Sequence, residues 1–156
     1  MAGNKFAVKL SKVKTEEVSF REPEEKIAKS FNDDFLSVGF ASYFGSDIDT
    51  NTVTVHLILN YDYGDEESGD LLRLLNYKGS FDFVFDNLKN YIDLKSNELL
   101  LPDHVLEKLL DISISTARGI IIVKTAGSFI NRFYLPVFDP KTLLKGMQQE
   151  DSEQIV

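Results

Sequence analysis

The longest regular pattern of apolar residues runs from Leu100 to Gly127 and predicts one long helix. Apolar residues recur there at helical spacing in two adjoining stripes, whereas packing on a single partner requires only one. Pro102 suits the first turn of a helix, and Gly127 can adopt the left-handed conformation that ends one. We therefore expect one stripe to pack on this chain and the other to meet another subunit. The first stripe comprises Val105, Leu109, Ile112, Thr116, Ile120 and Val123, and the second Leu106, Leu110, Ile114, Ala117 and Ile121.

Four segments before this helix alternate apolar and polar residues, which is typical of half-buried β-strands. They are residues 5–13 with an extended continuation over 15–20, then 35–44, 52–61 and 71–85. The shift of apolar parity at Val13 indicates a bulge or a strand end, and Gly79 indicates a bulge or a close approach of another backbone. Short loops favour an antiparallel meander of three or four strands, with residues 21–34 as a charged, solvated connector.

The remaining segments lack a clear period. Residues 86–98 are interpreted as a crossover from the sheet to the helix, and residues 128–140 as an irregular aromatic connector. Asp139 as N-cap and Pro140 as first residue predict a second, short helix. We predict an α+β fold, with a four-stranded antiparallel sheet packed against one long and one short helix. Residues 1–147 form a single domain, and residues 148–156 are an acidic, disordered tail.

Composition narrows the function further. The 156 residues carry a net charge of -8, which disfavours nucleic acid and favours basic or cationic partners. We expect a soluble, cytosolic protein with no membrane partner, because the N-terminus has no signal-like apolar run and no segment is long enough to span a membrane. With no cysteine and no recognisable catalytic or metal-binding constellation, we expect neither an enzyme nor a bound metal or cofactor.

Two weaker motifs have simpler interpretations. Residues 47–51 resemble the start of a calcium loop, but Thr52 occupies the position that requires glycine. The acidic turn over residues 62–70 is typical of a solvated hairpin loop. The twelve Phe and six Tyr are more informative, since many lie in the crossover and in the connector after the helix. They either cover the sheet and helix or line a surface groove for apolar segments.

Four short strings, in order along the chain, resemble the SecB family of protein-export chaperones over residues 5–147. They are TEEVSFREP at 15–23, GSFDF at 79–83, LLLPDHVLEKLL at 99–110 with STARG at 115–119, and LPVFDPKTLL at 135–144. The resemblance implies an ATP-independent holdase that binds apolar segments of unfolded client polypeptides in long grooves. It also implies a homotetramer, built as a dimer of dimers with the main helices in the tetramer interface.

The resemblance also implies roles for particular residues. The client-binding groove would comprise Phe83, Leu88, Tyr91, Ile92, Leu94, Phe129 and Tyr134. The subunit interface would include Ser113, Ala117, Gly119 and Ile120, whose small members let two helices approach closely. Glu17 matches an acidic position that contacts the SecA motor in the family, but Arg21 and Leu74 stand where two further acidic residues are expected. Docking to SecA is therefore open, and the alternative is a toxin-antitoxin-associated or mobile-element adaptor with one dedicated partner.

Overall fold

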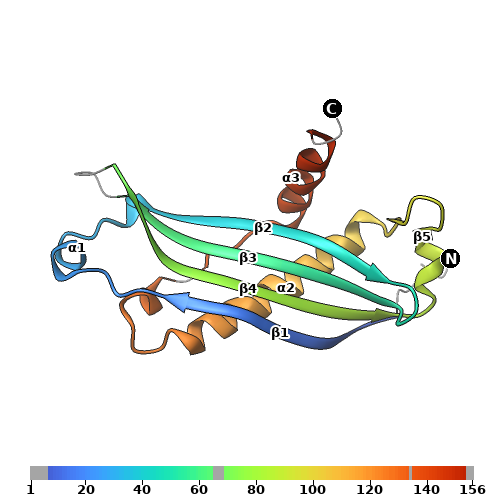
Figure 1. Ribbon diagram of the computed structural model, residues 1–156, viewed down its shortest axis with the longest axis horizontal. Coiled ribbons are helices and arrows are strands. Elements are labelled where there is room, and N and C mark those ends of the chain that lie inside the picture. Colours follow the sequence, from blue (N-terminus) through green and yellow to red (C-terminus); the bar gives the residue numbers. More distant parts are fainter. Residues whose placement is uncertain (1–6, 65–68, 134, 154–156) are drawn as a thin grey trace.

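Four strands form one antiparallel sheet in the computed structural model, which describes residues 7–64, 69–133 and 135–153 (Figure 1). The strands are β1 (Val8–Phe20), β2 (Leu36–Asp47), β3 (Thr52–Gly64) and β4 (Leu71–Phe85). Their order across the sheet is β1-β4-β3-β2, and helices cover one face of it. The predicted α+β fold with a four-stranded antiparallel sheet is thus confirmed.

The first strand departs from the predicted meander. Only β2, β3 and β4 pair in chain order, whereas β1 pairs with β4 at the opposite edge from β2. The connector between β1 and β2 must therefore cross the end of the sheet. It does so with the short helix α1 (Glu25–Lys29) and the 3-10 turn η1 (Asp33–Phe35), which the charged composition of this segment did not reveal.

Bulges interrupt the ladder at three places. β1 is one continuous strand with register shifts between Leu10 and Lys12 and between Thr15 and Glu17. Of the two alternatives at Val13, a bulge or a strand end, the bulge is confirmed, and residues 15–20 continue the same strand. In β4 the register with β3 shifts at Leu74, which is fully buried. The extra residue lets both Leu74 and its neighbour Leu75 point into the core.

The core lies between the sheet and the helices. In β3, every second residue from Val53 to Tyr61 is at most 1% exposed, as the alternation predicts. Gly79 faces the same core from β4, where the ring of Tyr77 lies directly over it. A side chain, not a second backbone, thus makes the close approach that the sequence indicates. The hydroxyl of Tyr77 is buried in this core, and burial raises its pKa.

The long helix α2 (Asp103–Lys124) crosses this face of the sheet (Figure 1). Pro102 is its N-cap residue, and Gly127 has a φ of 82°, which confirms the predicted left-handed conformation. The side of the helix that faces the sheet is buried and comprises Val105, Leu106, Leu109, Leu110, Ser113, Ile114, Ala117 and Ile121. The expectation that one stripe packs on the sheet of this chain is confirmed.

The crossover between β4 and α2 contains the 3-10 turn η2 (Leu88–Tyr91) and a small hairpin of β5 (Ile92–Asp93) and β6 (Glu98–Leu99). Asn51, in the turn between β2 and β3, anchors the start of this crossover through two hydrogen bonds. The side-chain oxygen of Asn51 accepts a hydrogen bond from the Leu88 N–H at 3.0 Å, and its backbone oxygen accepts one from the Phe85 N–H at 2.8 Å. Asn51 has a φ of 53°, a left-handed conformation that asparagine tolerates.

After α2, the chain forms the 3-10 turn η3 (Phe129–Arg132) and then the helix α3 (Pro140–Glu153). The Asp139 carboxylate accepts hydrogen bonds from the Lys141 N–H and the Thr142 hydroxyl, as its predicted capping role requires. Because α3 continues through Glu153, the predicted start of an unstructured tail at residue 148 is wrong. Residues 154–156 lie outside the described residues.

Candidate functional site

The structure separates the predicted groove residues into core and surface positions. Phe83, Leu88 and Ile92 are at most 5% exposed and belong to the core beneath the crossover, so their assignment to an open groove is wrong. The spacing of these residues in the sequence suits a core as well as a groove. Whether another segment covers them could not be read from the sequence. Tyr91 is half-buried, whereas Leu94 in the crossover is 74% exposed.

Phe129 lies at the other end of the sheet, in a cluster of aromatic rings. Phe31 stacks on Tyr63 with ring centroids 4.3 Å apart and touches Phe129 and Phe133 at 5.1 and 5.0 Å. The Arg132 guanidinium lies 3.7 Å from the centre of the Phe129 ring. This cluster fixes the α1 connector against η3, so Phe129 is half-buried and stands apart from the crossover. Tyr134, the remaining predicted groove residue, lies outside the described residues.

Exposed apolar side chains are found instead in the crossover and in the connector to α3, as at several other places on the surface. Leu94 and Leu100 in the crossover are 74% and 55% exposed, and Val137 just before α3 is 94% exposed. Phe138, Leu143 and Met147 are half-buried beside the core. We call these six residues the apolar shelf. Of them the sequence named only Leu94 as a groove residue, although it did single out the crossover and the aromatic connector as surface candidates.

Hydrogen bonds and one aromatic contact hold this region in place. Arg118 of α2 donates from Nη2 to the Pro136 carbonyl oxygen at 3.0 Å, which fixes the connector. The ring of Phe138 lies 5.8 Å from that of Phe40 in β2. Gln148 of α3 donates from Nε2 to the Asp103 carboxylate at the start of α2, at 3.2 Å. α3 therefore leans on both α2 and β2, close to the end of the crossover.

The predicted interface residues of α2 divide in the same way. Ser113 and Ala117 are fully buried against this chain, so they have no surface to offer a second helix and their assignment is corrected. They occupy the side of the helix that faces the sheet, which only the rotation of the packed helix could decide. Gly119 is exposed, with nothing within 4 Å of the position its Cβ would take. Ile120 is half-buried, and Val123 further along is 73% exposed.

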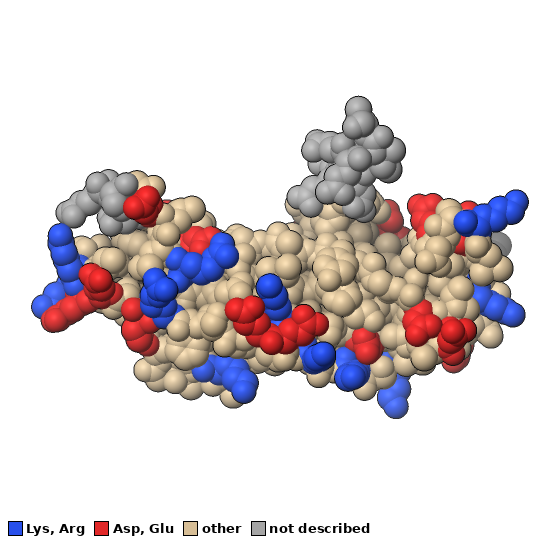
Figure 2. Space-filling view, in the orientation of Figure 1, with Lys and Arg blue, Asp and Glu red and all other residues tan. Residues whose placement is uncertain are grey.

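The opposite face of the sheet carries charge. In Figure 2, acidic and basic side chains lie near one another along the lower part of this face and at its ends, whereas much of its upper middle is uncharged. Glu17 in β1 accepts a hydrogen bond from Ser19 and lies 3.9 Å from Lys78. A side-chain hydrogen bond from Asn76 is the main cause that holds the pKa of Glu17 below its usual value. The carboxylate that matches a motor-docking position is thus already engaged within its own sheet.

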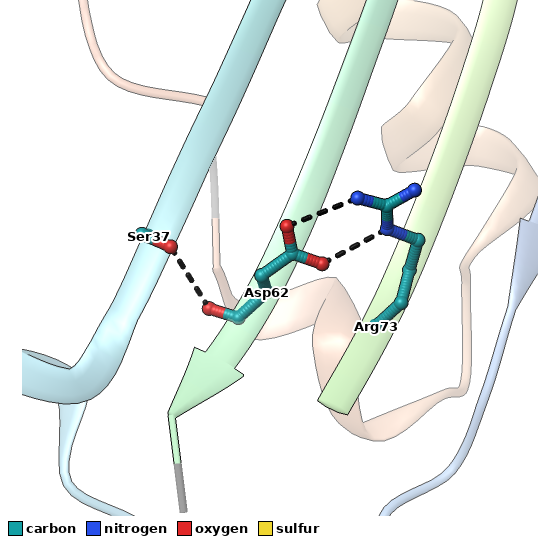
Figure 3. Close-up of polar contacts among 3 residues, drawn as sticks. All are labelled: Ser37, Asp62 and Arg73. Atoms are coloured by element: carbon teal, nitrogen blue, oxygen red, sulfur yellow. Dashed lines mark hydrogen bonds and ion pairs between the residues drawn. The ribbon is translucent and has the colours of Figure 1, made fainter. Parts of the chain in front are cut away.

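Arg21 and Arg73 line a shallow depression of about 370 Å³ next to Glu17. Arg73 forms a bidentate pair with Asp62 through bonds of 2.9 and 3.2 Å, and the Ser37 hydroxyl donates to the Asp62 carbonyl oxygen (Figure 3). This pairing raises the pKa of Arg73. Leu74 borders the same depression but is fully buried at its bulge, so it offers no charged group in place of the expected acidic residue.

Within the described residues, no group of three or more His, Asp or Glu side chains is placed to hold a metal ion. None of the described helices has the length and apolar composition needed to cross a membrane.

Comparisons with known proteins add one likeness. No protein-family model and no curated protein matches the sequence. Among solved structures, the chain is similar to the Mycobacterium tuberculosis Rv1957 SecB-like chaperone in complex with a ChAD peptide from the Rv1956 HigA1 antitoxin. The TM-score is 0.39 at 8% sequence identity, over 84% of this chain and 90% of that one. A likeness this weak supports no inference about function, which rests on the surface described above.

Proposed function

We propose that this protein is an ATP-independent holdase that binds apolar segments of unfolded polypeptides on the apolar shelf. The observation that carries the proposal is the exposure of Leu94, Leu100 and Val137, which are 74%, 55% and 94% accessible. Exposed apolar side chains that form a contiguous patch usually mark a surface that binds another protein. The net charge of -8 keeps copies of such a protein apart in solution.

The four ordered strings that resemble the SecB family support the same function independently of the geometry. One of them, LPVFDPKTLL, contains both Val137 and Phe138 of the shelf. We place the protein in the cytoplasm on the same ground. In this proposal the chain binds and releases clients without catalysing a reaction.

The proposed assembly is a homotetramer in which the solvent-facing side of α2 contacts a second α2. Ile122 and Val123 are 37% and 73% exposed. Gly119, one turn before Val123, has no atom within 4 Å of the position its Cβ would take. Two helices can approach closely at such a position, because glycine has no side chain. Gly119 and Ile120 keep their proposed interface role, whereas Ser113 and Ala117 support the helix from beneath.

Suppression of client aggregation tests the function. Purified protein at several-fold molar excess should slow the aggregation of a chemically unfolded model client without ATP. The double variant Leu94→Ser/Val137→Ser should lose most of this effect while keeping its fold, since both side chains are exposed. Leu71→Ser is the matched control, because Leu71 is 70% exposed at the start of β4, outside the shelf. Equal suppression by all three proteins would contradict the proposal.

A second candidate is an adaptor for one dedicated partner, such as an antitoxin. Arg21 favours it, because an exposed arginine beside Glu17 opposes the basic partner surface that SecA docking requires. Binding measurements against several unrelated unfolded proteins separate the two candidates. Comparable affinity for all of them supports the general holdase, whereas high affinity for a single partner supports the adaptor.

A further inference from the structure

The two edges of the sheet differ in how they are protected. β1 carries Lys9, Lys12 and Lys14 and two bulges, which are devices that prevent another strand from pairing with an edge. β2 has none of these features. Between Leu36 and Asp47 it contains no charged residue and no proline, and its register with β3 is uninterrupted over all twelve pairs. A long, regular and uncharged edge is a ready template for an additional strand.

The backbone of β2 is available on its outer edge. Among the described residues, no helix, turn or loop forms a backbone hydrogen bond with any residue from Ser37 to Asp47. Half of the N–H and C=O groups of an edge strand point away from the sheet. The natural partner for such a row is an extended polypeptide, because its own N–H and C=O groups repeat at the same spacing.

α3 supplies a second layer beneath that edge. It contacts β2 and α2 on the helix side of the sheet and extends past β2 (Figure 1). Phe138, beside Phe40 of β2, and then Leu143 and Met147 provide half-buried apolar side chains along this route. A strand added to β2 would therefore have its inward side chains over α3 instead of in water.

We propose that a client segment binds as a fifth strand on β2, with its inward side chains on the α3 part of the apolar shelf. This deepens the proposed holdase function and rests on it. The occupant is a single extended segment and not a second copy of this chain. α3 extends past the β2 edge, in the layer where the helices of a second copy paired antiparallel to β2 would lie.

The chemistry of the site defines the class of segment. Inward positions face apolar side chains, so every second residue of the client is apolar. Outward positions lie beside Gly39, Ala41 and Gly45, which are small and uncharged, and beside the exposed ring of Tyr43, which stacks on His56. No charged side chain of β2 between Leu36 and Ser46 can pair with a charged client residue. The site selects segments in which apolar residues alternate with uncharged polar ones, a pattern typical of sequences that form β-strands when a client folds.

Backbone methylation of a peptide tests this mode on the unaltered protein. The probe is a capped peptide of about ten residues that alternates Thr with Val or Phe, long enough to pair along β2. Two derivatives carry N-methyl groups on alternate residues, in the two possible phases. Only one phase removes the N–H groups that would bond β2, so it should weaken binding about tenfold or more, and the other phase should not. Equal binding of both derivatives would overturn the inference.

Protein variants complete the test. Ala41→Lys/Tyr43→Lys places two lysines on the exposed face of β2 and should weaken peptide binding about five- to tenfold. Thr15→Lys, on the exposed edge strand β1, is the control and should leave binding unchanged. Circular dichroism checks that each variant folds. A client-free solution mass that falls in the β2 variant would show that a second copy occupies the edge, and would overturn the inference.

The aggregation assay separates this inference from the function on which it rests. Suppression by the unaltered protein, together with phase-independent peptide binding, would overturn the fifth-strand mode and leave the holdase standing. Absence of both suppression and peptide binding would overturn the holdase itself. Suppression together with phase-dependent binding supports both.

Discussion

Replacing Gly79 by alanine tests whether the close packing of the sheet depends on this position. A Cβ atom built at Gly79 would collide with the hydroxyl of Tyr77 and lie 2.8 Å from its Cζ. Tyr77 is fully buried among the side chains of the core, so its ring has little freedom to move away. We expect Gly79→Ala to destabilise the protein, although alanine normally suits a strand better than glycine does.

The magnitude follows from two opposing terms. Forcing an extra methyl group into a packed core costs about 1–3 kcal/mol. Removing the backbone freedom of glycine from the unfolded chain returns about 0.4–1 kcal/mol. The net loss is roughly 0.5–2 kcal/mol, which for a protein of this size lowers Tm by roughly 1–8 °C.

Two comparison variants make the assay decisive. Gly39→Ala is the matched control, because the nearest atoms to its new Cβ lie at 3.7 Å, an ordinary contact. It should be neutral or slightly stabilising in the same thermal and urea unfolding experiments. Tyr77→Phe removes the colliding hydroxyl, so it should recover part of the loss when combined with Gly79→Ala. If Gly79→Ala and Gly39→Ala unfold with the same midpoints, Tyr77 does not restrict position 79.

Three further predictions concern pH, the crossover and assembly. Burial raises the pKa of Tyr61 to about 12 from the usual 10.0, so the unfolded chain releases this proton first as pH rises. About 2–3 kcal/mol of stability, fully present below pH 10, should be lost between pH 10 and 12. Urea unfolding at each pH should show a smaller alkaline loss of stability in Tyr61→Phe. The control Tyr43→Phe, where the side chain is 58% exposed, should lose as much as the unaltered protein. Asn51→Ala removes the acceptor for the Leu88 N–H and should lower the free energy of unfolding by about 1–2 kcal/mol, with faster hydrogen exchange at Leu88. Asn51→Gly also removes the acceptor but keeps the φ of 53° accessible. An equal loss of stability in both variants would assign the effect to the hydrogen bond alone. Gly119→Leu should shift the proposed tetramer toward dimer in native mass measurements without altering the protomer fold, and an unchanged mass would exclude α2 contact at this point.

The strands and the long helix could be predicted because each carries a period that its own environment imposes. In β3, one face meets the core and the other does not, and the alternation from Val53 to Tyr61 records this directly. α2 records its contact with the sheet in the same way. The short elements α1, η2 and η3 left no such record, because a single turn contains too few residues to show a period.

The candidate site was less predictable for a different reason. Aromatic and aliphatic residues have the same pattern whether they line a groove or fill a core, so Phe83, Leu88 and Ile92 could not be distinguished from Leu94. Burial depends on residues distant in the chain. Leu88 is covered beneath the crossover that Asn51 ties down from another loop, whereas Leu94 lies at the exposed tip of the hairpin between β5 and β6.

The sequence by itself determined the α+β class, the four strands, the extent of α2 and the capping of α3 by Asp139, since each follows from local periodicity or local chemistry. Tertiary structure alone decided that β1 pairs with β4, that Ser113 and Ala117 face inward, and that α3 leaves β2 as an open edge. These features arise from contacts between segments far apart in the chain. Period and composition describe each segment's own faces but not which distant segment covers them.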